Sequence, residues 1–278
     1  MTSSRLKKAV EDAILAPTYD SRRYVDEYLK PHMKRFTQTV AILQKIARPE
    51  MRVIDVASYG SLMPALKDIL GLVDITLTEP HQPNKAASED STLPNARYGH
   101  KYQFHIDRFD IGGSFPHRDS TFDLVIFTEV LEHLAVDPVH TLAAINRITK
   151  PGGWLLLSTP NCASAKSIAK ILRGGNPNIY PFYTKQPLRD RHNREYVPWE
   201  VKELLRSCGY HVNLLKTVDV YDEGQQANFK FFLIKKALWL ASFLSLGSIK
   251  AEDRGDTILA LGKKTSAVTD RYPAFLYV

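Results

Sequence analysis

The sequence predicts an α/β protein in which helices cover a mainly parallel β-sheet. Short apolar, β-branched runs alternate with longer segments whose apolar residues recur at helical intervals. Alternation of this kind is typical of strand–helix–strand units. The stretch RVIDVASYGSLMPALKDILGLVDITLTEP, residues 52–80, contains a complete unit, and an acidic residue closes each of its apolar runs.

The elements follow one another along the chain. Helices are predicted over residues 3–15 and about 20–47, and Pro49 is expected to end the second one because proline lacks a backbone N–H. Strands are then predicted at 52–57, 73–79, 103–109, 122–128, 153–159, 210–220 and 256–263. The helices between them are predicted at 62–70, 137–148 and 198–208.

Composition narrows the class of protein. The chain has 278 residues, of which 44% are hydrophobic and 24% charged, as is usual for a soluble domain with a core. Cys162 and Cys208 match no metal-ligand spacing, and the N-terminus lacks the apolar region of a secretory signal. We therefore expect a cytoplasmic protein. The net charge of +7 is typical of a solvated surface, with contact to an anionic substrate or a membrane face as the alternative; no nucleic-acid-binding motif occurs.

One segment, FKFFLIKKALWLASFLSL at residues 229–246, is strongly apolar. Its uncharged part is about ten residues long, too short to span a bilayer. It predicts either a core or lid helix, or a helix lying on a membrane. The second interpretation gives peripheral membrane contact and a place at the inner membrane surface.

Polar residues follow the first two predicted strands. Ligands of open α/β sheets bind beyond the carboxyl ends of the strands, where Asp55, residues 58–61 and Glu79 would lie. Glu79 comes 24 residues after Asp55, close to the interval of about 20 at which an acidic side chain meets ribose hydroxyls. The alternative is a solvent-exposed glutamate at a strand end.

The motifs STFDLVIFTEVLEHL, INRITKPGG and WLLLSTPN occur in that order. With them, residues 51–265 resemble the class I S-adenosylmethionine-dependent methyltransferases, in particular the methyltransferase type 11 group. The resemblance implies a Rossmann-like seven-stranded sheet of order 3-2-1-4-5-7-6, with strand 7 antiparallel. Residues 1–50 would be an N-terminal helical segment and 266–278 a tail. Within the domain, 160–198 would be an acceptor-site insertion and 228–247 an apolar helix.

The resemblance also implies S-adenosylmethionine as cofactor, with S-adenosylhomocysteine as product. Residues 55–61 occupy the family's first cofactor motif, commonly Asp-x-Gly-x-Gly-x-Gly, but its glycine places hold Ala57, Tyr59 and Ser61. Glycine permits close backbone approach and positive φ, so its loss leaves open a scaffold that no longer binds the cofactor. The expected binding residues of this loop are Asp55, Ala57, Ser58, Tyr59 and Gly60.

By the same resemblance, the cofactor site extends to the ends of the next three strands. The residues concerned are Glu79, Pro80, Asp107, Arg108, Thr128 and Glu129. Glu79 would hold the ribose hydroxyls. Asp107 would face the adenine amino group, with Asp110 as the alternative, and Arg108 would lie beside the ring.

The acceptor site is expected in residues 174–210. The part RHNREYVPWEVKELLRSCGY is similar to bacterial type 11 members, many of them linked to polysaccharide and glycan assembly. Aromatic faces beside hydrogen-bonding groups suit a sugar ring. The expected acceptor-binding residues are Tyr180, Tyr183, Arg194, Glu195 and Tyr196. The alternative is a loop clamp in which His192 and Glu195 bond to the backbone.

The predicted reaction is in-line methyl transfer to oxygen of a sugar, a glycan or a nucleotide-linked sugar. A sugar hydroxyl is a poor nucleophile, so a general base helps. His192 is the first candidate base. His133 is the second, although Glu132 and His133 would equally form a structural pair. No metal-ligand cluster is evident in the sequence, and assistance by a divalent ion stays open because several enzymes that methylate sugars use one. The alternative acceptors are a lipid or a small natural product.

Overall fold

The computed structural model describes most of the chain. Its described residues are 2–19, 21–181, 191–220 and 251–278, with Leu233, Lys236, Ala237, Trp239 and Leu240. Apart from those five residues, the apolar segment 229–246 lies outside this set, as does Tyr183. Among the residues that the structure describes, no helix combines the length and the apolar character that crossing a bilayer requires.

A mixed β-sheet organises the fold. Its strands are β1 (Arg52–Asp55), β2 (Asp74–Glu79), β3 (Ser88–Asn95), β4 (His100–Arg108), β5 (Phe122–Thr128), β6 (Thr149–Pro160), β7 (Tyr210–Val218) and β8 (Thr257–Lys264). Their order is β3-β4-β2-β1-β5-β6-β8-β7. Without β3, this is the predicted order 3-2-1-4-5-7-6. β1 pairs in parallel with β2 and β5, and β8 pairs antiparallel with β7, so the predicted fold class is confirmed.

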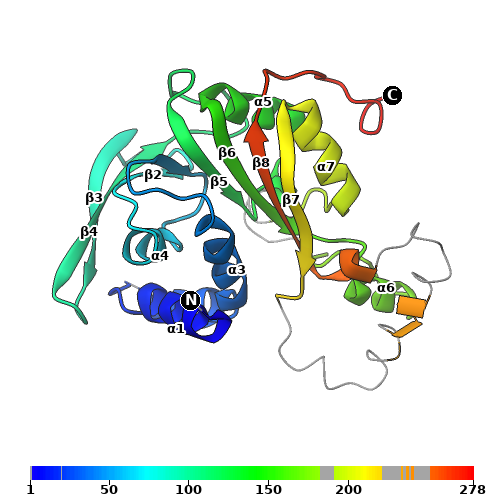
Figure 1. Cartoon of the computed structure of the whole chain (residues 1–278), viewed down its shortest axis with the longest axis horizontal. Helices are drawn as coiled ribbons and strands as arrows, with labels where there is room; N and C mark the ends of the chain where they lie inside the picture. Colours follow the sequence, from blue (N-terminus) through cyan, green and yellow to red (C-terminus); the bar gives the residue numbers. More distant parts are fainter. Residues whose placement is uncertain are drawn as a thin grey trace. The chain divides into compact units, whose positions relative to one another are not determined.

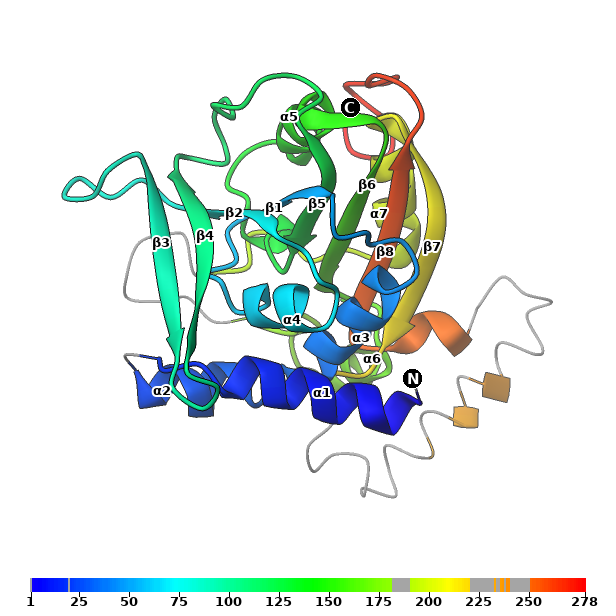
Figure 2. The same ribbon diagram turned by 60° about the vertical axis from the view of Figure 1, so that its left-hand side comes forward.

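Strand β3 is the addition to the predicted sheet. It pairs antiparallel with β4 along its whole length and forms a hairpin (Figure 2). Its sequence SEDSTLPN is polar and contains Pro94, so it carries no apolar alternation from which a strand would be predicted. Proline and exposed polar residues are tolerated at a sheet edge because no further strand pairs there.

The helices differ from prediction mainly near the N-terminus. They are α1 (Ser3–Leu15), α2 (Arg22–Tyr24), α3 (Met33–Leu43), α4 (Met63–Asp68), α5 (Pro138–Ile148), α6 (Ala165–Ile171) and α7 (Pro198–Ser207), with a π-helical turn at Val25–Leu29. The expected continuous helix over 20–47 is wrong. Pro31 interrupts it because proline cannot donate to the preceding turn, and α3 begins two residues later. Helix α6 was not predicted.

The chain forms two compact units. The first contains Met1–Phe127 and Ala143–Leu155, and the second contains Thr128–Leu142 and Leu156–Val278. In the first unit, α1 packs against α3 and α4 (Figure 1). In the second, α7 packs against β7 and β8. The expected domain division at residues 51 and 265 stays a prediction.

Candidate active site

Asp55 ends β1 and opens the predicted cofactor loop. Its side chain is completely buried, and neither carboxylate oxygen forms a hydrogen bond within the described part of the chain. Burial raises the pKa of Asp55 to about 7 because a charged carboxylate is disfavoured away from water. The Ser58 hydroxyl, which approaches without reaching hydrogen-bond geometry, and the Arg35 charge act in the opposite direction. A cationic or hydrogen-bonding ligand group would therefore be stabilised here.

The loop after β1 keeps the backbone of a glycine-rich turn although other residues occupy its glycine places. Ala57 and Tyr59 have φ of 55° and 50°, and Gly60 has φ of 76°. Left-handed backbone costs a residue with a side chain roughly 1–2 kcal/mol. The Ala57 N–H donates to Thr78 Oγ1 at 2.9 Å, and the Gly60 N–H donates to the Ser58 hydroxyl at 3.2 Å. These bonds help to hold the strained turn.

Tyr59→Gly is expected to leave the affinity for S-adenosylhomocysteine intact or modestly lower. The Tyr59 side chain is 63% exposed, so its ring is turned mostly to solvent. Relief of the left-handed strain is partly offset by the added freedom of the unfolded chain, about 0.4–1 kcal/mol. Calorimetry and a thermal melt measure both effects. A large gain in affinity would show that the tyrosine obstructs the site.

The N-terminal helices also reach this loop, which the sequence did not reveal. The Tyr24 hydroxyl lies 2.5 Å from the hydroxyl of Ser61, the residue at the third glycine place. The Tyr24 ring stacks on Tyr28 with centroids 5.4 Å apart, and Tyr28 accepts a hydrogen bond from Arg35 at 3.2 Å. Tyr24 and Tyr28 lie four residues apart in the predicted helix, a spacing that does not indicate contact with the loop.

Glu79 ends β2, followed by half-buried Pro80. It accepts a hydrogen bond from Arg108 Nε at 2.9 Å. The Arg108 side chain is only 2% exposed and also donates to Glu89 of β3 at 2.6 Å and to the Ala86 carbonyl at 2.9 Å. Arg108 therefore fixes the carboxylate of Glu79 at the strand end. Its predicted contact with an adenine ring stays a prediction.

Glu79→Ala is expected to weaken S-adenosylhomocysteine binding at least tenfold. Hydrogen bonds to a charged group contribute about 1.5–3 kcal/mol, and the variant loses those to the ribose. Calorimetry measures the affinity, and a melt detects destabilisation from the Arg108 charge that is left without this partner. Glu89→Ala is the matched control, since it removes the other carboxylate of the same arginine. Unchanged affinity in Glu79→Ala would place the ribose elsewhere.

Asp107, on β4, is held by two histidines. His117 Nε2 lies 2.8 Å from one carboxylate oxygen and His105 Nε2 lies 3.2 Å from the other. Burial acts to raise the pKa of Asp107, but the hydrogen bond to His117 and the further polar contacts outweigh it and hold the pKa below its usual range. The alternative residue, Asp110, is exposed and accepts from the Gly112 N–H at 2.9 Å. Either contact with adenine stays a prediction.

Thr128 and Glu129 belong to the second unit. Thr128 ends β5 and is half-buried. Glu129 has a φ of 57°, an uncommon conformation for a residue with a side chain, and turns the chain at the strand end. Its N–H donates to the Ser158 carbonyl at 2.9 Å, and its carboxylate accepts from the Ser158 hydroxyl at 2.7 Å. The predicted passage of both residues near the cofactor stays a prediction.

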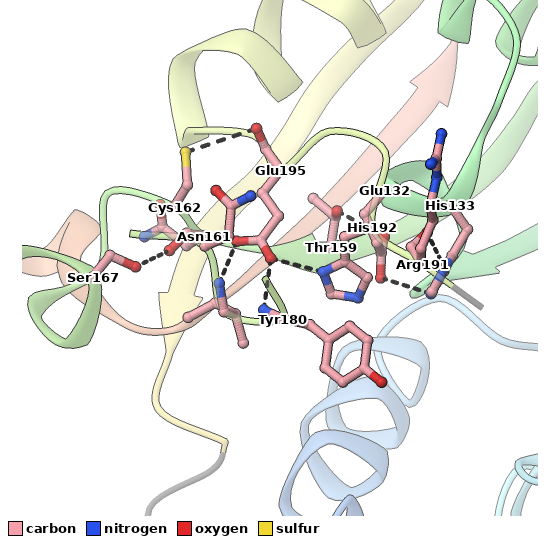
Figure 3. Close-up of polar contacts among 12 residues, drawn as sticks. Glu132, His133, Thr159, Asn161, Cys162, Ser167, Tyr180, Arg191, His192 and Glu195 are labelled. Atoms are coloured by element: carbon pink, nitrogen blue, oxygen red, sulfur yellow. Dashed lines mark hydrogen bonds and ion pairs between the residues drawn. The ribbon is translucent and has the colours of Figure 1, made fainter. Parts of the chain in front are cut away.

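The two histidines predicted as candidate bases lie together in the second unit (Figure 3). The His133 and His192 rings have centroids 4.8 Å apart and are nearly perpendicular, at 84°. Glu132 lies beside them with 1% exposure, and its carboxylate accepts from the Thr159 hydroxyl at 2.9 Å. One ligand atom from each of Glu132, His133 and His192 lies within 4.8 Å of the others. The three side chains could hold a metal ion, which the sequence did not predict.

Glu195 organises the loop around His192. Its buried carboxylate accepts from the backbone N–H groups of Ile179 and Tyr180, at 2.7 and 3.0 Å, and lies 2.7 Å from His192 Nδ1 (Figure 3). Burial alone would raise the pKa of Glu195, but the hydrogen bonds from His192 and the two backbone amides lower it. Glu195 therefore holds His192 and the backbone at 179–180, and its contact with an acceptor stays a prediction.

The remaining acceptor-site residues have separate surroundings. Tyr180 is 38% exposed, and its ring centroid lies 5.3 Å from that of His192. Arg194 pairs with Glu200 at 2.6 Å and lies over the Tyr196 ring, which is buried. Contacts of Arg194 and Tyr196 with an acceptor stay predictions.

A sheet with acidic residues closing its first two strands, and a polar cluster beyond its later strands, defines a nucleotide-cofactor-binding α/β enzyme. The chain belongs to the methyltransferase domain family, whose model matches residues 22–231. It is an S-adenosylmethionine-dependent methyltransferase domain, and S-adenosylmethionine is its cofactor. Family membership argues against a scaffold without cofactor.

Several known proteins resemble this chain at low sequence identity. An uncharacterized methyltransferase of Schizosaccharomyces pombe is 28% identical over 146 residues, which cover 51% of this chain and 52% of that protein. The ubiquinone biosynthesis O-methyltransferase of Xanthomonas campestris is 26% identical over 186 residues, 60% of this chain and 75% of that one. The match thus spans about half of the first relative and three quarters of the second. A chain of the complex between the Haloferax volcanii Trm112 methyltransferase activator and a methyltransferase has a TM-score of 0.54 at 18% identity, covering 88% and 96% of the two chains.

The residues at the first two strand ends fit the cofactor. The buried carboxylate of Asp55 has no hydrogen bond among the described residues, and the cofactor is a cation that would complement it. The carboxylate of Glu79, held at the end of β2 by Arg108, suits a vicinal diol. Asp55 and Glu79 would therefore hold the cofactor.

Proposed function

We propose that this chain transfers the methyl group of S-adenosylmethionine to a hydroxyl oxygen of a sugar, a glycan or a nucleotide-linked sugar. When bound, S-adenosylmethionine supplies a methyl group already activated on a sulfonium. The protein then has to hold an acceptor oxygen in line with that methyl group. The observation that carries the proposal is the pair of histidines, His133 and His192, beside buried Glu132.

The hydrogen bonds around the pair determine what each ring can do. His192 Nδ1 faces the Glu195 carboxylate, and His133 Nδ1 lies 3.0 Å from the Arg191 carbonyl. Both partners can only accept, so each Nδ1 carries a proton and each neutral ring has its lone pair on Nε2. His192 Nε2 can therefore take the proton of an acceptor hydroxyl, while Glu195 stabilises the imidazolium that forms.

Two observations support a hydroxyl-bearing acceptor. The relative from Xanthomonas campestris is named an O-methyltransferase, which favours oxygen as the methylated atom. Tyr180 offers a partly exposed aromatic face next to His192. An aromatic face beside a proton acceptor suits a sugar ring, which has apolar faces and hydroxyl groups at its rim.

A lipid or a small natural product is the second candidate acceptor. Its support is the same relative, whose name places it in ubiquinone biosynthesis. Leu233, Trp239 and Leu240 are also exposed, at 48%, 64% and 51%, and belong to the apolar segment 229–246. The basic residues of that segment would meet anionic headgroups, which would place the protein at a membrane surface. Flotation with anionic liposomes at low salt checks this contact.

Acceptor profiling tests the proposal. The purified chain is incubated with S-adenosylmethionine carrying a labelled methyl group and with two panels, nucleotide sugars with oligosaccharides, and phenolic and isoprenoid lipids. We expect transfer to a hydroxyl of the first panel, with the product stable to the mild alkaline treatment that cleaves methyl esters. Transfer only to the second panel would select the lipid alternative. Transfer to nitrogen or sulfur acceptors alone would overturn the assignment to oxygen.

A further inference from the structure

Glu132, His133 and His192 form a mixed set of one carboxylate and two imidazoles. Glu132 and His133 lie in the turn Leu131–His133 after β5, and His192 comes from the loop that precedes α7. Their ligand atoms lie within 4.8 Å of one another. Ligands at about 2.1 Å from an ion, at tetrahedral angles, lie about 3.4 Å apart, so small side-chain movements would bring these atoms to coordination distance.

Each of the three side chains is oriented by a further group. Glu195 and the Arg191 carbonyl hold the Nδ1 atoms of His192 and His133, at 2.7 and 3.0 Å. Thr159 donates to one oxygen of the Glu132 carboxylate. In metal sites, the histidine nitrogen that does not bind the ion usually donates to a carboxylate or a backbone carbonyl, which fixes the ring and its tautomer. Both arrangements occur here.

We infer that Glu132, His133 and His192 bind one divalent transition-metal ion through a carboxylate oxygen and two Nε2 atoms. Imidazole nitrogen suits zinc, copper, iron and nickel, whereas calcium, magnesium and manganese prefer oxygen ligands. Three protein ligands leave at least one position open, the arrangement of catalytic rather than structural sites. The site would therefore take an oxygen atom of the acceptor.

The catalytic consequence rests on the proposed function, whereas binding of the ion does not. An acceptor hydroxyl bound at the open position loses its proton to water more readily, because the cation stabilises the oxygen anion. The oxygen then forms a bond to the methyl carbon as the carbon–sulfur bond breaks, which yields the methyl ether and S-adenosylhomocysteine. When the ion is bound, His192 Nε2 is a ligand and does not accept the proton, which leaves to solvent.

Metal binding is measured directly on the untagged full chain. After dialysis against a chelator, Co²⁺ is added and its visible absorption followed, and Zn²⁺ is added in competition with a coloured indicator. We expect one equivalent of either ion. Glu195→Gln, which alters only the orienting contact, should weaken binding about 10- to 100-fold, and Glu132→Gln and His192→Ala, which each remove a ligand, should weaken it more. The range follows from the effects of orienting partners in metal sites.

His140→Ala is the matched control, since His140 is an exposed histidine of α5 in the same unit. It should bind like the natural chain. Melts of all variants, with S-adenosylhomocysteine titrations, identify those that fail to fold. Absence of Co²⁺ absorption, or equal loss of binding in His140→Ala, would overturn the metal site. If metal binds but no hydroxyl acceptor is methylated, the proposed function fails and the site stands. If hydroxyl methylation persists in the chelator-treated chain, the catalytic role of the ion is overturned.

Discussion

His192→Ala is expected to lower turnover about 10²–10⁴-fold, the usual contribution of a positioned acid–base group. The loss has the same direction whether His192 accepts the proton or binds an ion that promotes loss of the proton to solvent. Affinity for S-adenosylhomocysteine should barely change, because His192 contacts Glu195 and His133 and is none of the residues that would hold the cofactor. Turnover is measured with the acceptor identified by profiling.

Folding is the confounder, because Glu195 links His192 to the backbone of the 179–180 turn. A thermal melt and a cofactor titration on the same preparation control for it. If both are preserved and turnover stays near normal, His192 has a structural role only. His133→Ala is then the next variant. A large loss of turnover in that variant, with the cofactor affinity intact, would assign the role of base to His133 in the turn after β5.

Asp55→Asn is expected to remove a large pH dependence of stability. The pKa of Asp55 is about 7 in the folded chain, against about 3.9 when unfolded. Between these values the folded state keeps a proton that the unfolded state has released, so the free energy of unfolding falls as pH rises from about 4 to 7. Each pKa unit corresponds to about 1.4 kcal/mol, which gives a total of about 4 kcal/mol, an upper figure for a single group.

Urea unfolding at pH 4 and pH 8, without cofactor, measures this effect as the difference between the two proteins. Other groups that titrate in the same window contribute equally to both and cancel. We expect the variant to be more stable than the natural chain at pH 8, by about 2–4 kcal/mol, and similar near pH 4. Parallel pH profiles would show that the carboxylate is not desolvated as its burial indicates.

The strand order could be predicted because the family resemblance implies it, and the motifs that carry the resemblance lie on the buried strands β5 and β6. Leu124, Val125 and Ile126 are all completely buried, and such continuous apolar runs are typical of parallel strands covered on both faces. The edge strand β3 was not predicted because its residues are mostly polar and lack the apolar alternation that indicates a strand. The predicted helix over 20–47 is too long because the helical spacing of its apolar residues continues across Pro31, where the helix breaks.

The candidate site could be predicted in part, for a physical reason. Asp55 and Glu79 are the last residues of two neighbouring parallel strands, so the sheet brings them to the same edge. Their positions in the sequence therefore nearly determine where they lie in the fold. His133 and His192 are 59 residues apart in the sequence, and their meeting depends on the loop that Glu195 holds. The partnership of Arg108 with Glu79 and Glu89 likewise depends on the unpredicted hairpin.

That partnership also sets the charge at the end of β2. One guanidinium faces two carboxylates, Glu79 and Glu89, so the group as a whole carries one surplus negative charge. The methyl donor carries a positive sulfonium, and the product that remains after transfer is a neutral thioether. With the donor bound at Glu79 as predicted, attraction to this surplus would favour it over the spent product, and Glu89 of the edge hairpin would then contribute to exchanging one for the other after each turnover.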